Sequence, residues 1–136
     1  MKNIFPFLSL TVSLILASCA SLKEQDDCEK FKTGRFELRS EDNNSITIIE
    51  RNDSIQTESN ILTGHVVKAK IKWITDCEYE LTYFAQTSTS IDTIVPYVQS
   101  RPLKTTILKT GKGYCIFKSN MKGTNLILLD TLKVLR

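Results

Sequence analysis

The sequence predicts an all-β domain in which about eight antiparallel strands follow one another as an up-and-down meander. From Phe31 onward, Ile, Thr, Val, Tyr and Phe recur in short runs, and these residues favour a pleated, half-buried surface. Gly, Asn, Asp and Ser separate the runs, as is typical of tight turns. Because the connections are short, we expect consecutive strands to be neighbours in a small barrel or half-barrel, a lipocalin-like arrangement.

The N-terminal residues 1–18 have the layout of a secretory signal. A basic start at Lys2 is followed by an apolar run from residue 4 to residue 16 and then by small residues. Cys19 comes directly after Leu16-Ala17-Ser18, an arrangement that resembles the bacterial lipobox, in which the thiol is diacylated and becomes the new N-terminus. A plain signal peptide or a short membrane anchor is the alternative, but the run is shorter than the ~20 residues of a spanning helix.

This organisation predicts a signal peptide over residues 1–18, a tether over 19–30 and one β domain over 31–136. We expect lipidation at Cys19 to anchor the protein in the outer membrane or cell envelope, facing the periplasm or the cell surface. The formal net charge is +3, and the signal takes away only Lys2. The basic residues are spread among other types along the chain, and we therefore expect no nucleic-acid partner.

Three cysteines remain after Cys19. An exported chain forms disulfides, and we predict a Cys28–Cys77 bond that pins the tether to the sheet and leaves Cys115 reduced. A Cys77–Cys115 bond is the alternative. The spacing of these thiols and the single histidine, His65, do not indicate a metal site, so we expect no metal and no cofactor.

The first strands are expected at residues 35–38, 46–51 and 54–59. Gly34 stands at the entry to the first strand, where a backbone conformation reserved for glycine is expected. The second and third strands form a hairpin that turns at Asn52-Asp53.

The clearest hairpin joins residues 67–73 to residues 77–83. Apolar residues alternate with lysines in the first run and with glutamates in the second, so each has one buried and one solvated face. We predict a three-residue loop, 74–76, with left-handed backbone at Asp76. The predicted pairs are Trp73 with Cys77, Ile71 with Tyr79, Ala69 with Leu81, Val67 with Tyr83, Lys72 with Glu78 and Lys70 with Glu80.

Three further strands are expected at residues 103–109, 114–119 and 126–134, and residues 87–99 are expected to form a loop with some extended backbone around 94–98. These elements complete the barrel, and its interior is expected to be largely filled by side chains, so that no large ligand cavity is implied. The expected interior residues are Phe36, Val67, Ile71, Trp73, Tyr79, Leu81, Tyr83, Ile107, Cys115, Phe117 and Leu128.

Two segments, residues 28–36 and 73–81, resemble a group of short uncharacterised lipoproteins of Bacteroidota. Residues 50–53 and 56–58, between them, are also similar to that group, and the resemblance ends near Leu81. It implies a compact β-fold and an envelope location, and it supplies no catalytic residues. Some members bear a DNA topoisomerase IV label, which does not fit this chain because a topoisomerase needs a large multi-domain body and a DNA-binding fold.

Few motifs point to chemistry. Thr110-Gly111-Lys112-Gly113 is faintly like a phosphate-binding loop, but it lacks the required spacing and a following helix and is interpreted as a hairpin turn. Three Asp-Ser/Thr-aliphatic triplets resemble the O-glycosylation signature of exported Bacteroidota proteins, which makes Ser54, Thr93 and Thr131 candidate acceptors.

The sequence therefore predicts a cell-envelope lipoprotein that acts as a binding or interaction module rather than as an enzyme. The candidate partners are a small apolar ligand, a glycan or an envelope protein. If the function is binding, we expect it at the barrel mouth or on the loop over residues 87–99. The alternative is an enzyme whose site is assembled from scattered residues.

Overall fold

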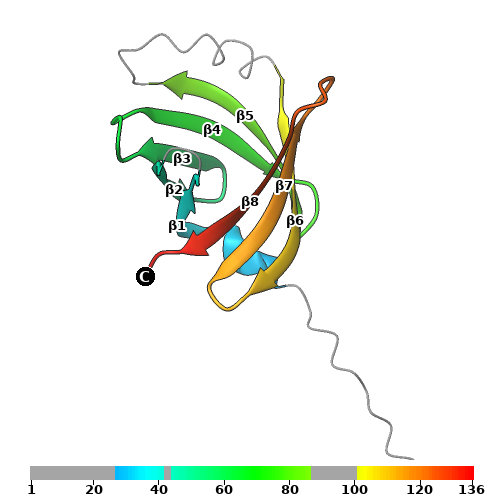
Figure 1. Ribbon diagram of the computed structural model, residues 1–136. Helices are drawn as coiled ribbons and strands as arrows, with labels where there is room; N and C mark the ends of the chain where they lie inside the picture. Colours follow the sequence, from blue (N-terminus) through cyan, green and yellow to red (C-terminus); the bar gives the residue numbers. More distant parts are fainter. Residues whose placement is uncertain (1–26, 42–43, 87–100) are drawn as a thin grey trace, which may run out of the picture.

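The computed structural model describes residues 27–41, 44–86 and 101–136, and these form eight antiparallel strands closed into a barrel (Figure 1). Each strand pairs with the next along the chain, and the last pairs with the first. The predicted meander is confirmed, in its closed form. After a short 3-10 helix, η1 (Cys28–Phe31), come β1 (Gly34–Arg39), β2 (Ile46–Arg51), β3 (Ile55–Asn60), β4 (Val66–Trp73), β5 (Glu78–Gln86), β6 (Leu103–Gly111), β7 (Tyr114–Met121) and β8 (Ile127–Val134).

The turns lie where their residues predict them. Between β2 and β3, the Asn52 side-chain oxygen accepts the N–H groups of Ser54 at 3.1 Å and Ile55 at 2.8 Å. Gly34 has a φ of +128° at the entry to β1, and Gly113 has a φ of +78° in the β6–β7 turn. Both angles lie in a region that L side chains rarely adopt, and this explains the glycines.

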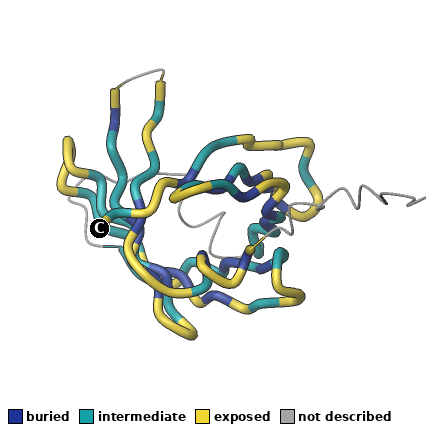
Figure 2. The backbone as a smooth tube through the Cα atoms, turned by 90° about the horizontal axis from the view of Figure 1, so that it is seen from below, coloured by how far each residue is buried: buried dark blue, intermediate teal, exposed yellow. Residues whose placement is uncertain are grey.

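One half of the barrel, next to η1, holds the hydrophobic core. Figure 2 shows the ring of strands from this end. The core residues are Cys28, Phe31, Phe36, Ile49, Ala69, Ile71, Tyr79, Leu81, Ile107, Cys115, Phe117 and Leu132. Residues 28–30, which the sequence placed in the tether, belong to this packed end, because η1 buries Cys28 and Phe31 against the sheet.

Most of the expected interior residues are buried or half-buried, but Leu128 is 46% exposed and that prediction is wrong. Leu128 is paired with Ser119 and faces inward, yet it lies on the half of β8 farther from η1. Leu132, four residues along, is opposite Cys115 and is only 1% exposed. The sequence pattern gave the right face of β8 but not the position along the barrel axis.

The β4–β5 hairpin has the predicted faces but not the predicted register. Lys68, Lys70 and Lys72 are exposed, and the alternate residues face the interior. The observed pairs are shifted by two residues on β5, which keeps every side chain on its face. They are Trp73 with Tyr79, Ile71 with Leu81, Ala69 with Tyr83, Lys72 with Glu80 and Lys70 with Thr82, followed by a bulge that pairs Val67 with Gln86.

The shift arises in the turn, where Cys77 leaves the ladder. The Ile74 N–H donates to the Glu78 carbonyl at 2.8 Å, and Cys77 is bonded to Cys28. The Cys77 carbonyl instead accepts the N–H of Ile107 on β6. Asp76 does not have the expected left-handed backbone, since Asn44 is the sole non-glycine of the described residues with a positive φ. The loop is therefore wider than predicted, and Cys77 is held outside the ladder by its bond to Cys28 and its contact with β6.

The seam that closes the barrel is short. β1 and β8 are paired only through Phe36, Glu37 and Leu38, opposite Val134, Lys133 and Leu132. The N-terminal half of β8 is paired with β7 alone among the described strands. The barrel is thus tightly closed near η1 and split along one side farther away. No helix among the described residues is long and apolar enough to cross a membrane.

Candidate functional site

Arg51, the last residue of β2, points into the barrel and ties η1 to the sheet. Its guanidinium donates to the Phe31 carbonyl at 2.8 Å, to Gln56 Oε1 at 2.6 Å and to the Tyr79 hydroxyl at 2.6 Å. It also lies 4.7 Å from the centre of the Tyr79 ring, within the range of a cation–π interaction. Arg51 is 7% exposed, and these neutral acceptors satisfy its hydrogen-bond donors inside the protein.

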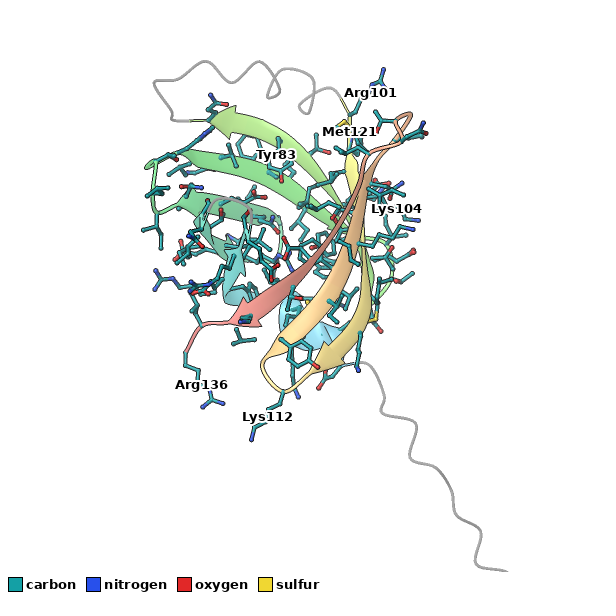
Figure 3. All side chains as sticks on the ribbon, in the orientation of Figure 1. Tyr83, Arg101, Lys104, Lys112, Met121 and Arg136 are labelled. Carbon is teal, nitrogen blue, oxygen red and sulfur yellow. A yellow bond between two sulfur atoms is a disulfide. The ribbon has the colours of Figure 1, made fainter. Side chains whose placement is uncertain are left out.

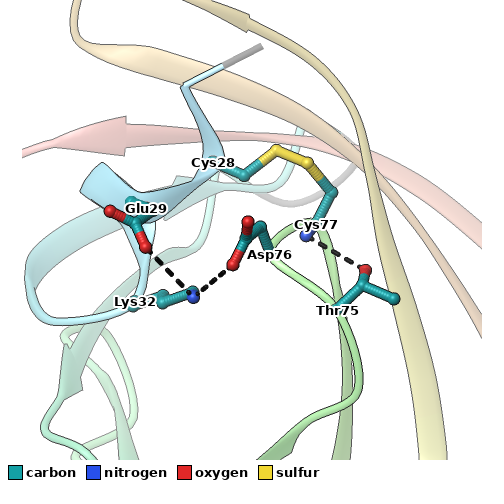
Figure 4. Close-up of polar contacts among 6 residues, drawn as sticks. All are labelled: Cys28, Glu29, Lys32, Thr75, Asp76 and Cys77. Carbon is teal, nitrogen blue, oxygen red and sulfur yellow. Dashed lines mark hydrogen bonds and ion pairs between the residues drawn. A yellow bond between two sulfur atoms is a disulfide. The ribbon is translucent and has the colours of Figure 1, made fainter.

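A disulfide holds η1 against the same end of the barrel (Figure 4). Cys28 and Cys77 are bonded, with their Cα atoms 5.2 Å apart, as predicted, and Cys115 is free and buried. Beside this bond, Lys32 Nζ lies 2.8 Å from Asp76 Oδ1, and the hydrogen bond to Asp76 raises the pKa of Lys32. The disulfide, η1 and Arg51 together close this end of the barrel.

The other end of the barrel is more open to solvent, because inward-facing side chains on five of its strands are not fully buried, although Ser119 and Met121 on β7 are buried. On each of five strands, the inward-facing residue near η1 is buried, whereas an inward-facing residue farther from η1 is half-buried or exposed. The pairs, with the buried residue first, are Ile49 and Thr47 on β2, Gln56 and Glu58 on β3, Ala69 and Val67 on β4, Leu81 and Tyr83 on β5, and Leu132 and Leu128 on β8. We call the less buried residues, together with Leu38 on β1, the cup: Leu38, Thr47, Glu58, Val67, Tyr83 and Leu128. Figure 3 labels Tyr83 at this end of the barrel.

Glu58 is the acidic group among the cup residues, and a second inward-facing carboxylate, Asp130, lies on β8 between Leu128 and Leu132. Its Oε1 accepts the Tyr83 hydroxyl at 2.6 Å and the Gln56 amide at 2.7 Å, so among the described residues both bonds converge on one carboxylate oxygen. Burial, and next the negative charge of Glu58, raise the pKa of Tyr83 well above its usual value, and the phenol stays a protonated donor. The second oxygen, Oε2, is available to a ligand that donates a hydrogen bond.

Polar contacts connect the cup to the closed end. Gln56 bonds to both Glu58 and Arg51, and Arg51 bonds to Tyr79. Burial raises the pKa of Tyr79, and the positive charge of Arg51 opposes that rise. Because each member fixes the next, the carboxylate of Glu58 is held on a rigid support.

A groove of about 670 Å³ lies along the split side of the barrel. Leu128 belongs both to this groove and to the cup, so the cup is adjacent to a lateral opening. The groove is lined by Glu37, Arg39, Ser40, Glu41, Ile116, Leu128, Leu129, Asp130, Thr131 and Lys133. Mixed apolar and charged groups line the opening.

The residues singled out from the sequence do not gather in one place. Ser54 is exposed in the β2–β3 turn, and Thr131 is half-buried on β8, whereas Cys19, Thr93 and the loop over 87–99 lie outside the described residues. Thr110-Gly111-Lys112-Gly113 spans the end of β6 and the β6–β7 turn, as the hairpin interpretation requires. Within the described parts of the chain, no group of three or more His, Cys, Asp or Glu side chains could hold a metal ion.

Arg51, Gln56 and Glu58 matter most in the interior. They lie in the segments 50–53 and 56–58 that the sequence singled out by resemblance, but the sequence pattern predicts no inward role for them. Two of them lie on β3, Ile55–Asn60, whose inward positions are all polar. Alternation of apolar and polar residues gives no face for such a strand. Gln56 is paired with Ala69, and Glu58 with Val67, both inward-facing residues of β4. Because paired residues share a face, this register places Gln56 and Glu58 inside the barrel.

Comparisons with known proteins give no relative. No protein-family model matches the chain, and searches of curated proteins and of solved structures find no match. The function is therefore inferred from the fold and from the residues of the cup.

Proposed function

We propose that this protein is a lipid-anchored binding module of the cell envelope whose cup takes a small, largely apolar ligand with a hydrogen-bond-donating or cationic group. One observation supports this above the others: a carboxylate, Glu58, lies in a half-buried position on the inner face of the barrel, toward its open end. Apolar walls with a few fixed polar groups are typical of small-molecule sites. Leu38, Val67 and Leu128 supply apolar surface around Glu58.

The envelope location rests on the N-terminal residues. The signal layout of residues 1–18 and the position of Cys19 support export and acylation, and the Cys28–Cys77 disulfide fits an oxidising compartment. The resemblance to short Bacteroidota lipoproteins agrees with this location. A glycan is a less favoured occupant, because Tyr83 is the one aromatic ring among the cup residues that the structure describes.

We do not favour enzymatic activity for this site. The polar groups of the interior bond to one another, and the hydroxyls of Thr105 and Ser119 are paired at 2.7 Å in a buried position. Burial raises the pKa of the Cys115 thiol to about 11, which keeps it protonated and unreactive at neutral pH. These groups serve the structure rather than a reaction.

The cup is tested by titration with 1-aminoanthracene, a fluorescent probe with an apolar body and one amine. The chain over residues 20–136 contains the whole described barrel and its disulfide, and it is used without acylation. We expect saturable binding that Glu58→Gln weakens about tenfold, since a hydrogen bond to a charged group is worth about 1.5–3 kcal/mol. Val67→Phe, which fills the cup, should abolish binding.

Glu50→Gln is the matched control. Glu50 is an exposed carboxylate on the outer face of β2, and its removal changes the net charge equally without touching the cup. Binding that is equal in Glu58→Gln and Glu50→Gln, or that survives Val67→Phe, would contradict the assignment of the cup.

Anchoring is tested separately in cells. Mass spectrometry of the envelope fraction should find an N-terminal acylated Cys19, and Cys19→Ser should stop this maturation. An unmodified N-terminus elsewhere in the mature chain would contradict lipidation while leaving the cup untouched.

A further inference from the structure

The charges of the barrel are divided between its two sides. Residues 101–136, which form β6, β7 and β8, contain eight basic residues and one acidic residue, a side-chain charge of +7. Residues 27–86 contain eight basic and eleven acidic residues, a charge of −3. Along the chain the basic residues are spaced apart, but the three strands lie side by side as one wall of the barrel (Figure 1). Four of the eight basic residues, Lys104, Lys109, Lys118 and Lys133, lie on these three strands, and the other four lie in the turns or at the ends of this part of the chain.

The outer surface of this wall combines lysines with exposed aliphatic side chains. Lys109 on β6, Lys118 on β7 and Lys133 on β8 are exposed, and Asp130, the single acidic residue of the three strands, is paired with the buried Phe117 and faces inward. Ile127 and Leu129 are 62% and 63% exposed on the same surface. We call the outward-facing residues of β6–β8 the basic face.

A groove of about 660 Å³ lies on the basic face. Lys104 and Lys118 line it together with Leu108 and Ile127, and Lys104 Nζ also lies 3.6 Å from Glu78 Oε1. Figure 3 shows Lys104 on the outside of the β6 wall. Cations beside aliphatic surface are the arrangement that suits an anionic headgroup with acyl chains beneath it.

The chain enters the barrel at the closed end, beside the C-terminal end of β6. The Asp27 N–H donates to Thr110 Oγ1 on β6 at 3.0 Å, and seven residues separate Asp27 from Cys19. Even fully extended, that stretch reaches about 25 Å, close to the length of one strand. An acyl chain on Cys19 would therefore keep the closed end of the barrel, with the C-terminal end of β6, within about that distance of the membrane surface.

We infer that the basic face lies on an anionic phospholipid bilayer, so that the barrel rests on its side next to its own anchor. The geometric part of this inference rests on the proposed acylation of Cys19, but the affinity of the face for lipid does not. Acidic residues on the two neighbouring strands bound the basic face. On β5, Glu78 is opposite Thr106 and Glu80 is opposite Lys104. On β1, Glu37 is opposite Lys133. Two weak contacts, a lipid anchor and a polybasic surface, together give stable membrane attachment.

Vesicle sedimentation of the unacylated chain over residues 20–136 tests the inference. The vesicles are phosphatidylcholine alone, or phosphatidylcholine with one quarter phosphatidylglycerol. We expect binding to the anionic vesicles, with a strong decrease between low salt and about 0.15 M salt. Replacing Lys109, Lys118 and Lys133 by Glu should lower partitioning about 100-fold, since each lysine near an anionic surface is worth about fivefold.

The matched control is the same triple change at Lys68, Lys70 and Lys72, which are exposed on β4, on the other side of the barrel. It alters the net charge identically and should leave most of the binding. A further variant, Ile127→Ser with Leu129→Ser, should lower partitioning about tenfold, and circular dichroism confirms that each variant is folded.

Equal losses in the two lysine triples would show attraction by net charge alone and would overturn the inference. Equal partitioning of the wild-type chain on both vesicle types would also overturn it and would leave the face to an acidic protein. Neither result bears on the cup or on lipidation, which are measured by probe binding and by mass spectrometry.

Discussion

Arg51 is the residue on which the closed end of the barrel depends. Its replacement by Ala should destabilise the fold by about 3–5 kcal/mol, because the Tyr79 hydroxyl, the Gln56 oxygen and the Phe31 carbonyl would lose their donor in a buried place. Urea unfolding measures the free-energy change. Arg35→Ala, which removes an exposed arginine from β1, should cost less than about 1 kcal/mol. Similar costs for the two variants would contradict the role given to Arg51.

Cys115 gives the barrel a specific pH dependence. Burial raises the pKa of this thiol from 9.0 to about 11, so the folded chain keeps a proton that the unfolded chain loses. The contribution is complete below pH 9 and is lost as the pH rises through about 11, a change of about 3 kcal/mol.

The measurement for Cys115 is urea unfolding between pH 8 and pH 11 in the wild type and in Cys115→Ala. The variant should lose less stability over that range, although Tyr79 and Tyr83, whose pKa values are also raised, add a decrease to both proteins. Parallel pH profiles would show that the thiol does not contribute.

At the scale of elements, the disulfide attaches η1 to the β4–β5 turn. It closes a loop with a sequence separation of 49, for which loop entropy predicts about 4 kcal/mol of stabilisation. Cys28→Ser with Cys77→Ser should lower the unfolding free energy by that order. The same variant should also expose amides of η1 to hydrogen exchange before the strands. If the amides of η1 and of the strands instead lost their protection from hydrogen exchange together, η1 would not unfold separately from the sheet.

The β4–β5 hairpin separates a packed face from a solvated one. Trp73 is half-buried, and its ring centre lies 4.6 Å from that of Tyr79. Trp73→Ala should cost about 3 kcal/mol, the lower end of the range for large aromatic residues, because the side chain lies at the edge of the core. Lys70→Ala should cost little, since Lys70 is exposed and opposite Thr82. Equal thermal shifts would contradict the assigned faces.

This hairpin also shows what sequence patterns determine. Alternation assigns each residue of β4 and β5 to a face, but a shift of two residues leaves all the faces unchanged and so is not visible in the pattern. The register depends on a contact distant in sequence, because bonding of Cys77 to Cys28 takes Cys77 out of the ladder. Tertiary structure decides what local alternation leaves open.

At the scale of the whole molecule, the eight-strand meander follows from composition and turn residues, whereas the difference between the two barrel ends does not. Leu132 and Leu128 share a strand and a face, yet one is buried and the other exposed. The difference arises from η1, Arg51 and the short β1–β8 pairing, which close one end only. Likewise, the polar inward residues of β3 acquire a face only through pairing with β4. The cup could therefore not be predicted from alternation.

We expect a small ligand to enter the open end of the barrel and to contact Glu58. The most direct measurement is nuclear Overhauser contacts between bound 1-aminoanthracene and the barrel over residues 20–136. We predict contacts to the methyl groups of Val67, Leu38 and Leu128 and to the Tyr83 ring, and none to Phe31 or Phe36 at the closed end. Contacts confined to Ile127 and Leu129 on the outer surface, or to the closed end, would contradict the account.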